Sequence, residues 1–302
     1  MMPPFQKDGD YVDLSIEELQ KPEFNTYIPA EIYHYTKLRT ALEKILPDRS
    51  MFLGRITQTN DPRETKERFY HDVNWGTSLG FGNPIGTILG IENREVTGEW
   101  RVFCACCSHY PPSDFLADYA LAQQSNILGD HHRYGMSYAK MWAQYGDNHS
   151  GICLVFDGQR LNYEIENRFK DLKYKIRHGF VRYDDALSVR DLPPNPDAEI
   201  NDRLSDDRLR HYQDKYYAEY FLYKSREWQS EHEFRWLVHS LDRNEKIEVQ
   251  IDNSIKAVIM GIDCLPVYQP SLQTLCDNLR IPLYKMRFLG GRPRADLVPR
   301  HP

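Results

Sequence analysis

The segment 228–238, which reads WQSEHEFRWLV, constrains the fold of this chain most strongly. In an extended strand the charged side chains of this segment share one face and its apolar side chains share the other: Glu231, Glu233 and Arg235 against Phe234, Trp236 and Val238. Paired carboxylates on a core-anchored strand suit three tasks, namely stabilising a developing cation, exchanging a proton, or holding a metal. The alternative is a solvated Glu/Arg face with modest ion pairing, although the strand is very apolar for a plain surface edge.

Length and charge limit the classes of protein to which this chain can belong. The chain has 302 residues, of which 41% are hydrophobic and 27% charged, so it has enough apolar residues for a hydrophobic core. Its length suggests about one or two domains. Its 38 Lys and Arg against 44 Asp and Glu give a net charge of −6, which argues against a chain-wide electrostatic grip on nucleic acid. The stretch from Arg280 onward is locally basic, because it holds six Lys or Arg and one Asp.

Strand-like and helix-like segments are mixed along the chain, which predicts the α+β class. We expect strands at 32–35, 51–56, 101–108, 151–156, 173–183, 233–239, 246–251, 257–261 and 282–288, and helices at 38–46, 115–124, 137–145, 199–228 and 270–279. Thr36 is the expected cap of the first helix and Pro47 its expected end. Residues 72–98 are expected to form a long loop.

The predicted organisation is an extended N-terminal segment at 1–29, a single α+β domain at 30–288, and a basic tail at 289–302. Pro-rich residues 184–198 mark a weak internal break. No apolar run reaches the roughly 18 residues that a membrane span needs, and the N-terminus lacks a signal-peptide segment, so we expect a cytoplasmic protein without a membrane partner. The crowded Cys104, Cys106 and Cys107 are more typical of a buried strand than of a zinc knuckle.

Three further clusters are candidates for a site. His34 lies between aromatic residues at the end of a strand, where it can either donate to a ligand or be a satisfied core histidine. Asn60 and Asp61 bring an amide and a carboxylate to a turn, which needs no function to explain it. Trp142 and Tyr145 are three residues apart and share a helix face, as core aromatics also do. No Walker loop, G-x-G-x-x-G or G-x-S-x-G motif is present.

An ordered set of motifs resembles a family of uncharacterised bacterial proteins, a domain of unknown function found in abortive-infection and phage-defence settings. The motifs are YHYTKLRTALEKIL, NDPRE, VFCACCS, MWAQYGDNHSGICLVF and REWQSEHEFRWL, and the similarity extends from about Ile32 to Gly261. This resemblance implies a toxin or defence effector, with a partner protein of a defence or toxin–antitoxin system.

More distantly, an H-x-T strand followed by a helix and a late E-x-E strand are similar to the mono-ADP-ribosyltransferases, in particular to the DNA-modifying toxins. That similarity implies a mixed, mostly antiparallel split β-sheet core with flanking helices, NAD as substrate, and no metal. It also implies a macromolecular acceptor, either nucleic acid or protein.

The same similarity assigns roles to individual residues. His34 would bind the nicotinamide-side ribose with Thr36 beside it, Glu233 would be the catalytic carboxylate, and Glu231 would activate the acceptor. Trp142 or Tyr145 would pack on the nicotinamide. We also expect the remaining candidates to contact NAD, namely Tyr35, Asn60, Asp61 and Arg235. Arg235, two residues after Glu233, can instead neutralise that carboxylate.

Three functions therefore stay open. The leading hypothesis is an NAD-consuming ADP-ribosyltransferase-like effector or NAD hydrolase. The second is a metal-dependent nuclease that binds Mg²⁺ through Asp61, Glu64, Glu231 and Glu233. The third is a non-catalytic sensor or antitoxin-like module, which would use a stripe of tyrosines on the 199–228 helix as its partner surface: Tyr212, Tyr216, Tyr220 and Tyr223.

Overall fold

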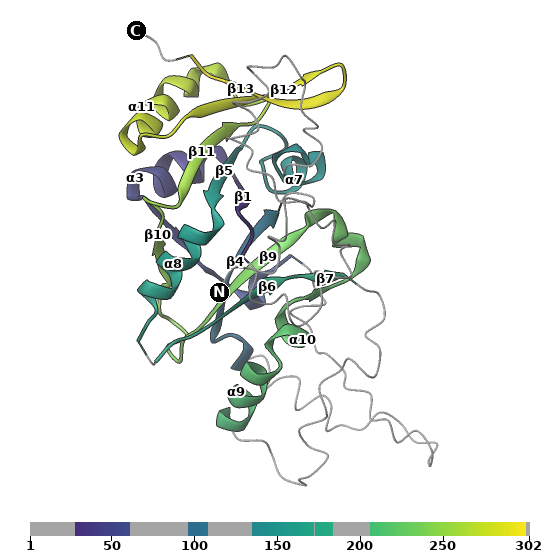
Figure 1. Cartoon of the computed structure of the whole chain (residues 1–302), viewed down its shortest axis with the longest axis vertical. Helices are drawn as coiled ribbons and strands as arrows, with labels where there is room; N and C mark the ends of the chain where they lie inside the picture. Colours follow the sequence, from purple (N-terminus) through teal and green to yellow (C-terminus); the bar gives the residue numbers. More distant parts are fainter. Residues whose placement is uncertain (1–27, 61–95, 108–134, 172, 184–205, 300–302) are drawn as a thin grey trace, which may run out of the picture.

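The computed structural model describes residues 28–60, 96–107, 135–171, 173–183 and 206–299. Among these residues one large, mostly antiparallel open sheet dominates (Figure 1). Its strands run in the order β13 (Arg292–Leu297), β12 (Leu283–Leu289), β11 (Ile255–Met260), β5 (Ile152–Asp157), β1 (Glu31–Thr36), β4 (Trp100–Cys107), β9 (Glu233–His239) and β6 (Lys175–Phe180), with β3 (Gly54–Arg55) on β4. Only β11 and β12 pair in parallel within this sheet as described.

Two short strand pairs lie beside the large sheet. β2 (Ser50–Phe52) pairs antiparallel with β10 (Glu248–Gln250), and β7 (Arg182–Tyr183) pairs in parallel with β8 (Tyr223–Lys224). The β7–β8 pair matters for the site, because it brings Lys224 beside the start of β9.

Helices cover both faces of the sheet. The main core lies on the face covered by α2 (Leu38–Thr40), the π-helical turn η2 (Ala41–Ile45), α3 (Leu46–Asp48), α8 (Gly158–Arg168) and α11 (Gln269–Leu279). On the opposite face, the 3₁₀ turn η5 (Gly135–Ser137) and α7 (Ala139–Gln144) pack near β1 and β5. Further along that face, α10 (Tyr217–Phe221) packs near β4 and β9.

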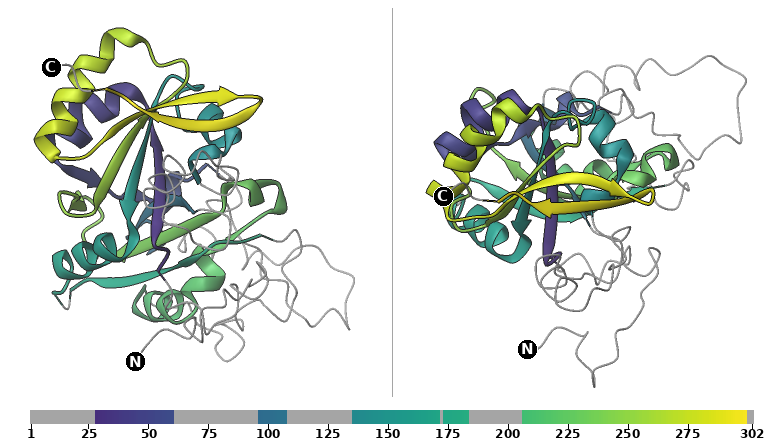
Figure 2. Two further views of the ribbon diagram at one scale, coloured as in Figure 1. Left: turned by 45° about the horizontal axis from the view of Figure 1, so that its top comes forward. Right: turned by 90° about the horizontal axis from the view of Figure 1, so that it is seen from above.

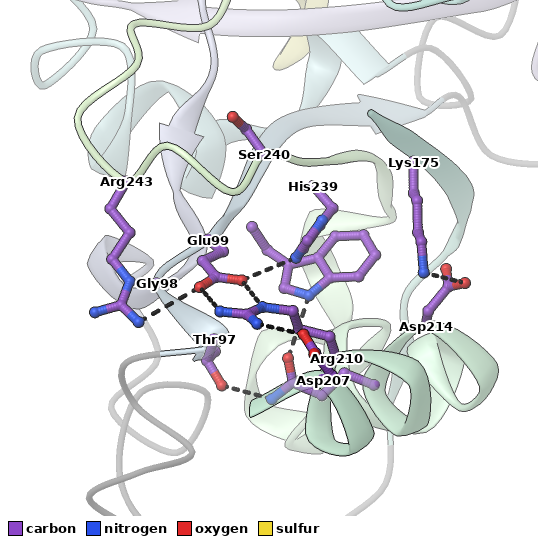
Figure 3. A network of polar contacts seen from close by, with 12 residues as sticks. Thr97, Gly98, Glu99, Lys175, Asp207, Arg210, Asp214, His239, Ser240 and Arg243 are labelled. Carbon is purple, nitrogen blue, oxygen red and sulfur yellow. Dashed lines mark hydrogen bonds and ion pairs between the residues drawn. The ribbon is translucent and has the colours of Figure 1, made fainter. Parts of the chain in front are cut away.

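Helix α9 (Asp206–Lys215) is joined to the sheet by a buried ionic network (Figure 3). Glu99, which directly precedes β4, accepts two hydrogen bonds from Arg210 at 2.8 and 2.9 Å. His239 and Arg243 approach the same carboxylate at 3.1 and 3.4 Å. Burial raises the pKa of Glu99, but hydrogen bonds and charges from Arg210 and His239 outweigh it and lower the pKa.

The sheet opens between β1 and β4. These strands pair only at Ile32–Cys107 and Tyr33–Cys106, whereas β1 pairs with β5 along its whole length. Beyond Tyr33 the two strands therefore diverge, and the half of the sheet built on β5 and β11 separates from the half built on β9 and β6 (Figure 2).

The predicted mixture of helices and mostly antiparallel strands is confirmed. The strand predicted at 233–239 has the same bounds as β9, and Phe234, Trp236 and Val238 are buried in the main core as expected. Helix α8 was not predicted. Its first turn is capped by the Asp157 side chain, which accepts from the Arg160 N–H.

Several predicted bounds were wrong. Thr36 is the buried last residue of β1 rather than a helix cap, and helix continues through Pro47 until Arg49 adopts a left-handed conformation. The strand expected at 51–56 is divided, because β2 pairs with β10 and β3 pairs with β4. The helix expected to reach residue 228 ends at Phe221, and β8 follows it.

Part of the expected basic tail is a strand. Arg292–Leu297 form β13, which pairs along the whole of β12 except its first residue. Most of the N-terminal segment 1–29, most of the 72–98 loop, the 115–124 helix and the 184–198 break lie outside the described residues. No helix in the described part of the chain combines the length and apolar character that a membrane crossing requires.

Candidate functional site

A cavity of about 340 Å³ lies where β1 and β4 diverge. Part of its lining is aromatic and apolar, with Tyr33, Tyr35, Phe103 and Met141 among the walls. The lining also includes most of the predicted site residues, among them His34, Asn60, Tyr145, Glu231, Glu233 and Arg235. The volume lies within the usual range of small-molecule sites, and the combination of apolar walls with a few convergent polar groups is typical of them.

His34 comes from β1 and is half-buried at the opening between the strands. Its Nδ1 lies 3.1 Å from the Cys104 carbonyl oxygen, and its ring stacks on Phe103 with the centroids 5.2 Å apart. A carbonyl oxygen only accepts, so Nδ1 carries the proton. Burial lowers the pKa of His34, so the ring is neutral and Nε2 is an acceptor suited to a ligand hydroxyl.

Glu233, the first residue of β9, is a fully paired carboxylate. Arg235 holds it in a fork, with Nε 2.8 Å from Oε1 and Nη2 3.0 Å from Oε2, and Lys224 Nζ lies 2.7 Å from Oε2. Burial raises the pKa of Glu233, but the charges of Arg235 and Lys224 outweigh it and hold the pKa at about 2. Glu233 is therefore ionised, and its charge is neutralised by its own neighbours.

Glu231 behaves differently although it lies two residues away. The Tyr145 hydroxyl donates to its Oε1 at 2.6 Å, and Lys224 Nζ lies 2.7 Å from its Oε2. Burial raises the pKa of Glu231, and the charge of Glu233 adds to this rise while Lys224 opposes it. Of the two carboxylates, Glu231 is thus the one that can exchange a proton nearer to neutral pH.

The path of the chain before β9 explains how the two carboxylates meet. Glu231 ends the 3₁₀ turn η6 (Arg226–Glu231), and His232 follows with φ 45° in a left-handed conformation. Glu231 is therefore not on the strand, and the prediction that Glu231, Glu233 and Arg235 share one strand face was wrong for Glu231. Lys224 on β8 bridges the two carboxylates instead.

Tyr145, just after α7, lines the cavity beside Glu231. Burial raises the pKa of Tyr145, with Glu231 adding to the rise and a hydrogen bond to Asn60 opposing it. Trp142 does not line the cavity. It is buried, its indole N–H donates to the Met136 carbonyl at 2.7 Å, and its ring packs edge-on against Tyr35.

The remaining predicted residues fall into three groups. Tyr35 lines the cavity with its hydroxyl donating to the Gly135 carbonyl at 2.5 Å, and Asn60 lies at the cavity wall next to Thr59. Thr36 is buried and is not among the lining residues. Asp61 lies outside the described residues.

Sequence reasoning missed Lys224 and Arg55, both of which line the cavity. Lys224 is buried and lies in YFLYKSREW, where a lysine among apolar residues is a weak signal that it is paired with a buried acid. With Arg55, Lys224 and Arg235 against Glu231 and Glu233, the lining carries three cations and two carboxylates. The cavity therefore suits a ligand that is at least partly anionic.

The geometry weakens the metal hypothesis at the E-x-E pair. The Lys224 ammonium lies 2.7 Å from both carboxylates, in the position where a bridging cation would bind. Of the other proposed ligands, Asp61 and Glu64 lie outside the described residues. Within the described ranges no group of three or more His, Cys, Asp and Glu is arranged to hold a metal ion.

Part of the chain matches a known family model. The model, described as a protein of unknown function (DUF2971), matches residues 141–236. This range includes Tyr145, Lys224, Glu231, Glu233 and Arg235, and it excludes His34 and Asn60. No curated protein and no solved structure matches the chain.

Proposed function

We propose that this protein binds NAD in the cavity between β1 and β4 and cleaves its nicotinamide–ribose bond, either by hydrolysis or by transfer of ADP-ribose to an acceptor. The observation that carries the proposal is the convergence of His34, Tyr145 and the Glu231–Glu233 pair on one cavity of about 340 Å³. His34 comes from the opening strand β1, Tyr145 directly follows α7, and Glu233 begins the late strand β9 with Glu231 in the turn just before it.

Charge and shape support a nucleotide as the ligand. Three cations against two carboxylates favour the pyrophosphate, and Arg55 is exposed at the wall where it can reach a phosphate. The aromatic rings of Tyr35 and Tyr145 give the positively charged nicotinamide ring a π surface. His34 Nε2 accepts from a ribose hydroxyl in this arrangement.

Glu231 is the proposed proton-exchanging residue. Bond cleavage releases neutral nicotinamide and leaves positive charge on the sugar, which water or an acceptor hydroxyl then attacks while Glu231 takes the proton. Glu233 is held in ion pairs by Arg235 and Lys224, so its proposed role is to keep these two cations in position at the cavity wall. Glu231 thus keeps the acceptor-activating role that the resemblance implies, whereas Glu233 is assigned a supporting role in place of that of the catalytic carboxylate.

The test is to incubate the purified protein with NAD and follow nicotinamide release. We expect Glu231→Gln to reduce the rate about 10²–10⁴-fold, the range of general acid–base catalysis. Glu227→Gln is the matched control, because Glu227 lies exposed in the same 3₁₀ turn and is expected to leave the rate unchanged. Release that is equal in both variants would remove Glu231 from the chemistry.

One observation favours a second candidate, a non-catalytic module that binds a nucleotide. Both oxygens of Glu231 and of Glu233 already have partners within the protein, as in a rigid binding site. This candidate predicts that NAD at a hundredfold excess over Kd raises the free energy of unfolding by about 2.7 kcal/mol. The melting temperature rises accordingly, and no nicotinamide is released. Thermal shift and nicotinamide release measured on the same sample separate the two candidates.

A further inference from the structure

Strands β12 and β13 form a two-stranded ribbon that extends past the rest of the sheet (Figure 2). β11 pairs with β12 only at Leu283–Lys285, whereas β12 and β13 stay paired as far as Leu289 and Arg292. The turn at the tip is Gly290–Gly291, with φ 58° and 78° and open space around both glycines. Beyond Lys285 the ribbon is therefore an arm whose outer edge and tip face solvent.

The two faces of this ribbon have different characters. Alternation places Tyr284, Met286 and Ala295 on one face, where all three are buried against the core beneath. On the other face Arg287 lies directly opposite Arg294, and Lys285 lies opposite Asp296. The ribbon thus presents a basic face away from the core.

The cross-strand pairing of Arg287 with Arg294 is electrostatically unfavourable for the folded protein. Like charges directly opposite each other on a strand pair are destabilising. Both guanidinium groups lie beside the same carboxylate, since Arg287 Nε is 3.5 Å from Asp296 Oδ2 and Arg294 Nε contacts Asp296 Oδ1. One carboxylate cannot neutralise two arginines, so a positive charge remains on the arm although the whole chain carries −6.

The tip of the arm also exposes apolar side chains. Phe288, on the same face as Met286, is 46% exposed, and Leu289, on the same face as Arg287, is 54% exposed. Arginines that neutralise phosphates, together with an exposed aromatic ring on which a base stacks, are the combination used by proteins that bind nucleic acid.

We propose that the β12–β13 ribbon is a nucleic-acid-binding arm, in which Arg287 and Arg294 contact backbone phosphates on the basic face and Phe288, exposed at the tip on the opposite face, packs on a base of a strand that passes around the tip. A two-stranded ribbon also has the width of the DNA major groove. The proposal does not depend on chemistry in the cavity between β1 and β4, and it can hold if NAD is not the ligand there.

The experiment measures binding of fluorescein-labelled single-stranded RNA, single-stranded DNA and duplex DNA, each about 20 nucleotides long, by anisotropy at salt concentrations from about 50 to 200 mM. We expect Arg287→Gln/Arg294→Gln to weaken binding by about tenfold or more. The salt slope is expected to fall by about 2, because each of the two arginines no longer neutralises a phosphate. Phe288→Ala is expected to weaken binding of the single strands more than binding of the duplex.

The matched control is Arg160→Gln. Arg160 on α8 is as exposed as Arg287, at 68% of the side chain, and its Nε lies 3.6 Å from an aspartate, Asp157. We expect this control to leave affinity and salt slope unchanged. The proposal is overturned if the control and ribbon variants lose affinity equally, or if the unmodified protein does not bind. It is also overturned if poly-glutamate displaces the nucleic acid as effectively as unlabelled nucleic acid does, because the arm would then suit an acidic protein partner.

Discussion

The side chain that most defines the candidate site is Glu233, which ordinary burial would keep protonated. Its fork to Arg235 and its contact with Lys224 keep it ionised in a position that is only 5% exposed. Such a cluster is not by itself a source of stability, because burying each charge is costly. It does, however, make every member depend on the others.

We therefore predict that Glu233→Gln destabilises the protein by about 3–5 kcal/mol, because the buried Arg235 loses the carboxylate that it holds in a fork, whereas Lys224 keeps its contact with Glu231. Adding Arg235→Met to that variant is expected to restore part of the loss, since the cation that has lost its carboxylate is removed. Urea unfolding of the two single variants, the double variant and Glu227→Gln measures this coupling. Strictly additive effects would contradict a shared network.

The same residue predicts an acid-sensitive stability. The folded-state pKa of about 2 lies below the ordinary glutamate value of 4.5, so Glu233 stabilises the fold above about pH 4.5. This contribution, about 3 kcal/mol, is lost as pH falls from about 4.5 to 2. Glu231 has a raised pKa and acts with the opposite sign, since its contribution is lost as pH rises.

Unfolding free energies measured from about pH 2 to 7 test this prediction. In Glu233→Gln the decline between about pH 4.5 and 2 is expected to be shallower than in the unmodified protein. An identical acid profile in the two proteins would show that Glu233 titrates normally in the folded state.

At the level of elements, strands with a strong local sequence pattern were predicted well, whereas strands that depend on pairing with a distant segment were not. Segments whose apolar run or alternation is strong, such as β4, β5 and β9, were predicted within one or two residues of their bounds. β8 and β13 were not predicted, because both are polar or only two residues long and exist through a partner strand. Strand pairing of this kind leaves little trace in local sequence.

Helix α9 also depends on a contact with a distant segment, in this case the ion pair between Arg210 and Glu99. We predict that Arg210→Met destabilises the protein by about 3 kcal/mol, because Glu99 loses its bidentate partner in a site where its side chain is only 1% exposed (Figure 3). Asp207→Asn is the control, since Asp207 also pairs with Arg210 but its side chain is 93% exposed.

Hydrogen exchange across 206–215 gives the local measurement for this prediction. We expect exchange of the α9 amides to become faster in Arg210→Met and to stay unchanged in Asp207→Asn. Equal effects of the two substitutions would mean that the buried half of the network does not anchor the helix.

At the scale of the whole molecule, a sheet that opens between β1 and β4 still has a continuous core. Ile32, Leu154 and Phe156 on one side of the opening belong to the same core cluster as Phe234 and Trp236 on the other. Phe103 lies between the two sides, with its ring 6.3 Å from Phe156 and 5.9 Å from Trp236. The opening is thus a local gap in strand pairing above a shared core.

We accordingly predict that the described core unfolds in one cooperative transition rather than as two units. Differential scanning calorimetry should give a calorimetric enthalpy equal to the van't Hoff enthalpy. Phe103→Ala, which removes the ring between the two sides, is expected to lower stability by about 3–5 kcal/mol while keeping a single transition. Two separate transitions in the unmodified protein would contradict a single folding unit.

The sequence by itself determined the residue types and most of the strands that frame the site. An imidazole at the end of an early strand and two carboxylates and a guanidinium around a late, apolar strand could all be identified from local pattern. The tertiary structure decided that β1 and β4 separate after two residue pairs, that Lys224 bridges Glu231 and Glu233, and that Tyr145 rather than Trp142 faces the cavity. These outcomes depend on contacts between segments far apart in the chain, whose geometry is set by packing and pairing rather than by the local order of residues.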